Sequence, residues 1–197
     1  ELPRIGFKFT TNQLFWLAAL PGISGAVFRA LYSFVVPIFG GRNFTVWSTA
    51  MLLLPTLWIG FAVQDPTTNY AVFVAIALLC GLGAGNFSSS MANISFFYPK
   101  RLQGTALGLN AGVGNLGVGL AQLVAPVAMY GGALLILGGG AQSRVDQGTT
   151  MSIWVQNAGF IWVPLIVLSV LAAWFGMDNI ASVRATFAEQ LAILRHK

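Results

Sequence analysis

Apolar residues fill the chain in five long runs, and polar residues gather in the segments between them. Each run reaches or exceeds the ~20 residues that an α-helix needs to cross a bilayer. Prolines inside the runs fit this prediction, because neighbouring helices can satisfy the carbonyls that proline leaves unpaired. The pattern predicts five transmembrane helices joined by short connections and one longer one, GGGAQSRVDQGTTMS. Their expected ranges are 12–39, 44–63, 70–98, 102–137 and 153–176.

The segment 178–197 has a different pattern, with apolar side chains on one helical face and Asp178 as a candidate N-cap. The face consists of Ile180, Val183, Phe187, Leu191 and Leu194. We expect an amphipathic helix along the cytoplasmic membrane surface, and an ordinary linker helix between two bundles is the alternative. The predicted organisation is a transmembrane bundle over 1–177 followed by this linker helix.

Composition supports an all-α integral membrane protein. Charged residues make up 8% of the chain, hydrophobic residues 56%, and the mean hydropathy is +0.76. An ordinary soluble domain has about 25% charged residues, so a soluble globular protein is excluded. With one cysteine, Cys80, and one histidine, His196, the chain offers few metal ligands, and we expect no metal site and no cofactor.

The net charge of +5 comes from basic residues placed singly at the ends of the apolar runs. This placement is typical of membrane proteins and argues against nucleic acid as a partner. One side of the membrane receives Arg42, Lys100, Arg101, Arg184, Arg195 and Lys197, and the other receives Arg4, Lys8 and Arg144. The richer side is expected to be cytoplasmic, which puts Glu1 outside. A protein whose N-terminus is cytoplasmic then needs one further helix before Glu1, and we expect that helix.

Arg29 is the unusual residue, because it lies inside the first apolar run. A charge near mid-membrane costs about 2.5–3.5 kcal/mol and normally faces a protein interior or a water-filled cavity. Gly22, Gly25, Tyr32 and Ser33 share its helical face. Since no Asp or Glu falls within the five runs, an anion site is favoured over a buried ion pair, although backbone carbonyls are an alternative partner. The planar fork of guanidinium donors suits a small oxyanion.

Two further stripes are polar or small. The third run carries Asn86, Ser89, Ser90 and Asn93, with Gly81 and Gly85 one turn apart; the fourth carries Gly104, Gly108, Gly112, Asn115, Gly119 and Gln122 on one face. For most of the glycines we expect close helix packing. Asn115 fits that interpretation less well, because its carboxamide needs a partner helix or a ligand.

Several long segments resemble the nitrate/nitrite porters of the major facilitator superfamily. They are ALPGISGAVFRALYSFVVPIFGGRNFTVWST, GNFSSSMANISFFYPKRLQGTALGLNAGVGNLGVG and AAWFGMDNI. The stretch with Gly104, Gly108, Gly112, Gly114 and Gly117 resembles that family's nitrate signature. The resemblance implies that the five helices are the second to sixth of twelve, in an N-terminal bundle of two inverted three-helix repeats that here lacks its first helix.

The resemblance also implies roles for single residues. Arg29 corresponds to the arginine that binds nitrate, Asn115 to a hydrogen-bond donor to the anion, and Phe87 to a ring packed against it. Tyr32, Ser33, Asn86 and Ser89 are candidate cavity-lining residues. The segment PIFGGRNF lacks the acid that many facilitators carry after the second helix, which puts a gating lock based on that acid in doubt.

We therefore expect alternating-access transport of nitrate and nitrite in the bacterial cytoplasmic (inner) membrane, by a protein that is monomeric when joined to its C-terminal half. Nitrate/nitrite exchange is the simpler mechanism, because the five runs contain no titratable Asp, Glu or His. Nitrate–proton symport, transport of another small anion, and an anion sensor on a carrier fold are alternatives. An enzyme is not expected, because no nucleophile–base pair is evident.

Overall fold

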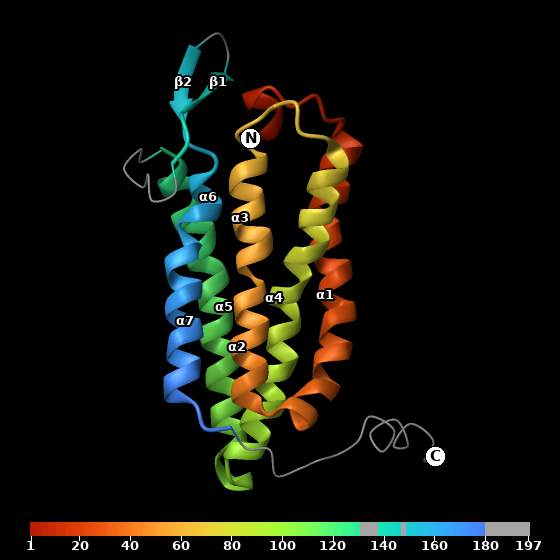
Figure 1. Ribbon diagram of the computed structural model, residues 1–197, viewed down its shortest axis with the longest axis vertical. Coiled ribbons are helices and arrows are strands. Elements are labelled where there is room, and N and C mark those ends of the chain that lie inside the picture. The colour runs from red at the N-terminus through yellow and green to blue at the C-terminus, as the bar shows by residue number, and fades with distance from the viewer. Residues whose placement is uncertain (131–137, 147–148, 180–197) are drawn as a thin grey trace.

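The computed structural model describes residues 1–130, 138–146 and 149–179. Its helices run side by side along the long axis of the molecule (Figure 1). In chain order the elements are a 3₁₀ helix η1 (Leu2–Ile5), α1 (Thr11–Phe39), α2 (Gly41–Met51), α3 (Leu53–Ala62), α4 (Tyr70–Phe97), α5 (Lys100–Tyr130), β1 (Gln142–Asp146), β2 (Thr149–Ile153), α6 (Asn157–Phe160) and α7 (Trp162–Gly176).

Within the described ranges, five helical segments are long and apolar enough to cross a membrane, which confirms the five predicted spans. The pairs α2–α3 and α6–α7 each form one of these spans, Gly41–Ala62 and Asn157–Gly176. Local capping explains where two of the helices, α1 and α4, begin. Thr10 and Gln13 form a capping box before α1, and the Asn69 side chain accepts a hydrogen bond from the backbone N–H of Ala71 at the start of α4.

The structure contradicts one predicted helix start, and two predicted segments extend beyond the described residues. The fourth predicted helix extended to residue 137, but α5 ends at Tyr130, and 131–137 lie outside the described residues. The fifth predicted helix began at 153, where β2 ends; the helical segment begins at Asn157. The linker helix predicted over 178–197 lies outside the described residues from position 180 onward.

The longest connection contains a β-hairpin, which the sequence analysis did not predict. β1 and β2 pair antiparallel, with Gln142 opposite Ile153 and Asp146 opposite Thr149. The strands are short and mostly polar, and they pair only with one another among the described residues. The hairpin packs on η1 and on the end of α5, and those contacts are not visible in a local sequence pattern.

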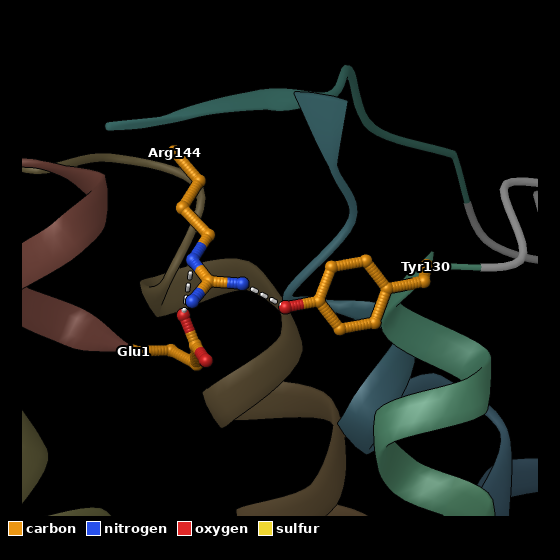
Figure 2. A network of polar contacts seen from close by, with 3 residues as sticks. All are labelled: Glu1, Tyr130 and Arg144. Atoms are coloured by element: carbon orange, nitrogen blue, oxygen red, sulfur yellow. Dashed lines mark hydrogen bonds and ion pairs between the residues drawn. The ribbon is translucent and has the colours of Figure 1, made fainter. Parts of the chain in front are cut away.

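The hairpin, η1 and the α3–α4 connection gather at one end of the bundle, which we call the hairpin end (Figure 1). Arg144 of β1 joins three segments there, as Figure 2 shows. Its Nε lies 3.3 Å from the Glu1 Oε2, its Nη1 donates a hydrogen bond to the Tyr130 hydroxyl, and its guanidinium carbon lies 5.8 Å from the centre of the Tyr130 ring. One side chain thus links the chain start, the end of α5 and the hairpin.

The helices pack most extensively between α1 and α4, while α1 and α5 do not contact one another in the described structure. A cluster of buried apolar residues lies at the hairpin end around Phe7, Phe73 and Ile153. A second cluster, around Tyr32, Phe44 and Leu82, joins α1, α2 and α4. Ala128 is the one buried residue of α5, so nearly all of that helix offers its side chains to lipid or to further protein.

Candidate anion-binding site

Arg29 projects from the middle of α1 and is exposed. Its Nε–H donates a hydrogen bond to the Ala84 carbonyl of α4 at 3.1 Å. Its guanidinium carbon lies 5.5 Å from the centre of the Phe87 ring, also on α4. Across the residues that the structure describes, no carboxylate lies within ion-pair distance of Arg29. The backbone carbonyl that the sequence left as an alternative partner is therefore present, but it uses only one of the five guanidinium N–H groups.

Phe87 lies beside Arg29, on the neighbouring helix. The Phe87 residue is 38% exposed, so the ring lies at the surface of the described bundle rather than in its packed interior. A cation over an aromatic face is attracted by the ring quadrupole. The ring also limits water access to one side of the guanidinium, which strengthens any charge-assisted hydrogen bond formed on that side.

The four candidate cavity-lining residues differ in exposure, with Asn86 intermediate between the exposed and the buried ones. Ser33 is exposed and donates a hydrogen bond to the Ala30 carbonyl at 2.7 Å. Tyr32 and Ser89 are buried, at 5% and 4% exposed, between packed helices. The Tyr32 ring stands edge-on to Phe44 with centroids 4.8 Å apart. In the described structure the side chains of these two residues are therefore packed in the interior, and Tyr32 belongs to the cluster that joins α1, α2 and α4.

Two buried polar atoms in this region have no hydrogen-bond partner among the described residues. They are the Tyr32 hydroxyl and the Asn86 Oδ1. Ser89 donates to the main-chain carbonyl of Asn86 at 3.0 Å and not to the Asn86 Oδ1. An unpaired buried polar group costs about 1–3 kcal/mol.

Asn115 of α5 is exposed, and because α1 and α5 do not contact one another, the described structure does not bring it together with Arg29. The neighbouring signature glycines also face open space. A Cβ added at any of them meets no atom within 4 Å; they are Gly104, Gly108, Gly112, Gly114 and Gly117. No described residue packs against these five positions, and the close helix packing expected for most of the glycines stays a prediction here.

Close packing through glycine occurs instead between α1 and α4. A Cβ at Gly25 would lie 2.6 Å from the Ala84 Cβ, and a Cβ at Gly81 would lie 2.6 Å from the Gly25 nitrogen. The expectation is thus confirmed for Gly81 and for Gly85, whose Cβ would lie 2.7 Å from the Tyr32 ring. These three glycines let the two backbones approach closely.

The sequence analysis missed Asn110, whose Nδ2 donates to the Ser90 hydroxyl at 3.1 Å and joins α5 to α4. The polar stripe containing Ser90 was the available signal, but it did not identify the partner. No metal-ligating cluster of three or more His, Cys, Asp or Glu side chains occurs in the described part of the chain.

Comparison with known proteins finds relatives that are similar to this chain over almost its whole length. The nitrate/nitrite transporter NarU of Escherichia coli (strain K12) is 54% identical over 195 residues, which cover 99% of this chain and 42% of NarU. NarU of Salmonella typhimurium is 53% identical over 195 residues, with the same coverage. The probable nitrate/nitrite antiporter NarK2 of Thermus thermophilus is 46% identical over 201 residues, covering 100% of this chain and 44% of NarK2.

No protein-family model matches the chain. The chain spans less than half the length of these curated relatives. The matches nevertheless run through all five spans, and the arginine on α1 and the glycine-rich α5 lie within them. On this basis, the chain belongs to the nitrate/nitrite porter family of the major facilitator superfamily.

Proposed function

We propose that the full-length protein carries nitrate and nitrite across the bacterial cytoplasmic (inner) membrane by alternating access, with the residues after Gly176 on the cytoplasmic side. The observation that carries this proposal is Arg29. It is a permanent charge inside a membrane span, exposed on an open face, with an aromatic ring beside it and no carboxylate partner among the described residues. Its relatives are named as nitrate/nitrite transporters and antiporters.

Arg29 supplies the positive charge and the directional donors for the anion, and Phe87 forms one wall of the site. Asn115 contributes a carboxamide donor when the helices that complete the cavity bring α5 toward α1. The lipid bilayer surrounds the exposed apolar surface, and the C-terminal half of the same protein closes the cavity in a monomer. No enzymatic step and no cofactor is part of the proposal.

Exchange of nitrate for nitrite is the coupling that these residues favour. The sequence of the five spans contains no Asp, Glu or His, and arginine keeps its charge across the physiological pH range. Without a carboxylate or an imidazole, these spans lack the usual proton carriers, whereas two anions of equal charge can alternate at one arginine. Nitrate–proton symport requires a titratable group elsewhere in the full-length protein.

The test is nitrate uptake into proteoliposomes that contain the full-length gene product, either loaded with nitrite or empty. Arg29→Lys keeps the charge and removes the fork of donors; Arg101→Lys, at the exposed start of α5, is the matched control. Uptake that requires internal nitrite, is lost in Arg29→Lys and persists in Arg101→Lys supports the exchanger.

Other results contradict specific parts of the proposal. Uptake into empty vesicles that depends on an inward proton gradient replaces exchange with symport. Stronger competition by another small anion than by nitrite changes the substrate. Nitrate binding without any flux favours a sensor. Normal transport by Arg29→Lys makes the arginine structural.

A further inference from the structure

The orientation of the Arg29 guanidinium is determined from α4. Its Nε–H is used by the Ala84 carbonyl at 3.1 Å, and its plane is bordered by the Phe87 ring. A guanidinium can offer an anion either the edge with Nε and one Nη, or the end with both Nη atoms. With Nε–H occupied, the end with Nη1 and Nη2 remains, and it presents two parallel donors that match two oxygens of a planar oxyanion.

The Ala84 carbonyl is within hydrogen-bond distance of the Arg29 Nε only because α1 and α4 cross closely. Gly25 lies one turn before Arg29 on the same face of α1 and directly faces Ala84; a Cβ there would lie 2.6 Å from the Ala84 Cβ. On α4, Gly81 and Gly85 flank Ala84 and have equally little space. Because the Ala84 Cβ is fixed to its backbone, a side chain added at Gly25 must move the backbone of one helix, and with it the Ala84 carbonyl.

We propose that Gly25 and Ala84 are positioning residues for Arg29. Their close contact sets the spacing of α1 and α4, the Ala84 carbonyl then holds Nε–H, and the Nη1/Nη2 end faces the anion. The crossing thereby makes the site selective for planar oxyanions over spherical anions of the same charge. This inference rests on the proposed function, because it takes Arg29 as the anion-binding group.

A purely structural role for the crossing gives a different expectation. If the crossing served helix packing alone, a substitution there would change the amount or the thermal stability of folded protein. It would weaken the binding of all anions equally. Orientation of a fork of donors matters for nitrate, whose oxygens accept directional hydrogen bonds. It matters little for bromide, which has no preferred direction. The ratio of bromide to nitrate dissociation constants therefore separates the two roles.

The experiment measures nitrate and bromide binding by isothermal titration to the folded, purified full-length protein. Gly25→Ala is the test variant. Gly22→Ala is its matched control, since it is the same change on the same helix at a position where a Cβ meets no atom within 4 Å. The double variant Gly25→Ala/Ala84→Gly moves one methyl group from α4 to α1 and restores the space at the crossing.

We expect Gly25→Ala to raise the nitrate dissociation constant about tenfold and the bromide constant by less than about twofold. Gly22→Ala should keep the wild-type ratio, and the double variant should regain it. If Gly25→Ala does not fold, Gly85→Ala replaces it. Its Cβ meets side-chain atoms of Tyr32 and Phe28, of which the Tyr32 ring can rotate away, and we expect a smaller change of the same sign.

An unchanged ratio in folded Gly25→Ala or Gly85→Ala overturns the inference and leaves the proposed function standing. The same holds if the folded double variant keeps the altered ratio, or if Gly22→Ala alters it equally. A wild-type protein that binds no nitrate overturns the proposed function itself, and the inference with it.

Discussion

The guanidinium carbon of Arg29 lies 5.5 Å from the centre of the Phe87 ring, although the two residues are far apart in the chain and belong to different helices. Both side chains are exposed. The pair therefore forms a surface with a charge, directional donors and one apolar wall, which is suited to a weakly hydrated monovalent anion. A substitution of Phe87 therefore tests the contribution of this contact directly.

Replacing Phe87 by leucine keeps an apolar side chain and removes the aromatic face. A cation–π contact at an exposed site contributes about 0.5–1 kcal/mol, so nitrate affinity should fall about two- to fivefold. The measurement is the nitrate dissociation constant of the full-length protein. Phe97→Leu is the matched control, because Phe97 lies on the same helix and is also 38% exposed. Equal effects of the two substitutions would contradict a specific contact with Arg29.

The main features of the bundle were predictable from local signals. Apolar length gave the spans, and the capping residues Thr10 and Asn69 define starts of α1 and α4 that the predicted ranges match within one residue. The hairpin Gln142–Ile153 was missed because its strands pair only with one another in the described structure and lack a strong alternation of apolar and polar residues.

The site was only partly predictable, because periodicity gives a helix face but not its neighbour. Gly81 and Gly85 repeat at the same spacing as Gly108 and Gly112, yet only the first pair packs against another helix in the described structure. A phenylalanine in an apolar helix gives no signal, so Phe87 came from the family resemblance alone. The Ala84 carbonyl belongs to the main chain and leaves no mark in the sequence.

The hydrogen bond from Asn110 to Ser90 should couple α5 to α4. In a double-mutant cycle, Asn110→Ala and Ser90→Ala should show a coupling energy of about 0.6 kcal/mol, typical of hydrogen bonds between membrane helices. The measurement is the free energy of unfolding of the full-length protein in mixed detergent. Asn115→Ala with Ser90→Ala is the control and should be additive, because Asn115 is exposed. Additivity of Asn110 and Ser90 would show that the bond contributes no stability.

The Arg144–Tyr130 hydrogen bond should hold the hairpin against the end of α5 (Figure 2). Tyr130→Phe keeps the ring under the guanidinium and removes the hydroxyl acceptor, at a cost of about 1 kcal/mol. Amide hydrogen exchange in Gln142–Asp146 should therefore become about fivefold faster. Tyr98→Phe is the matched control, since Tyr98 is exposed to a similar extent at 47% against 44%. Unchanged exchange in Tyr130→Phe would place the stability of the hairpin in its other contacts.

The connection between α3 and α4 should respond to acid through Asp65. The hydroxyl and the backbone N–H of Thr67 donate to its carboxylate at 2.7 and 2.8 Å, and these bonds lower the pKa of Asp65 from its ordinary value of 3.8. Because the folded-state pKa lies below the unfolded one, the carboxylate stabilises the turn above pH 3.8. That contribution is lost as pH falls through the folded-state pKa. Carboxyl carbon NMR should show the pKa returning toward 3.8 in Thr67→Val and staying low in the control Thr68→Val. If Thr67→Val leaves the pKa low, the hydroxyl is not its main cause.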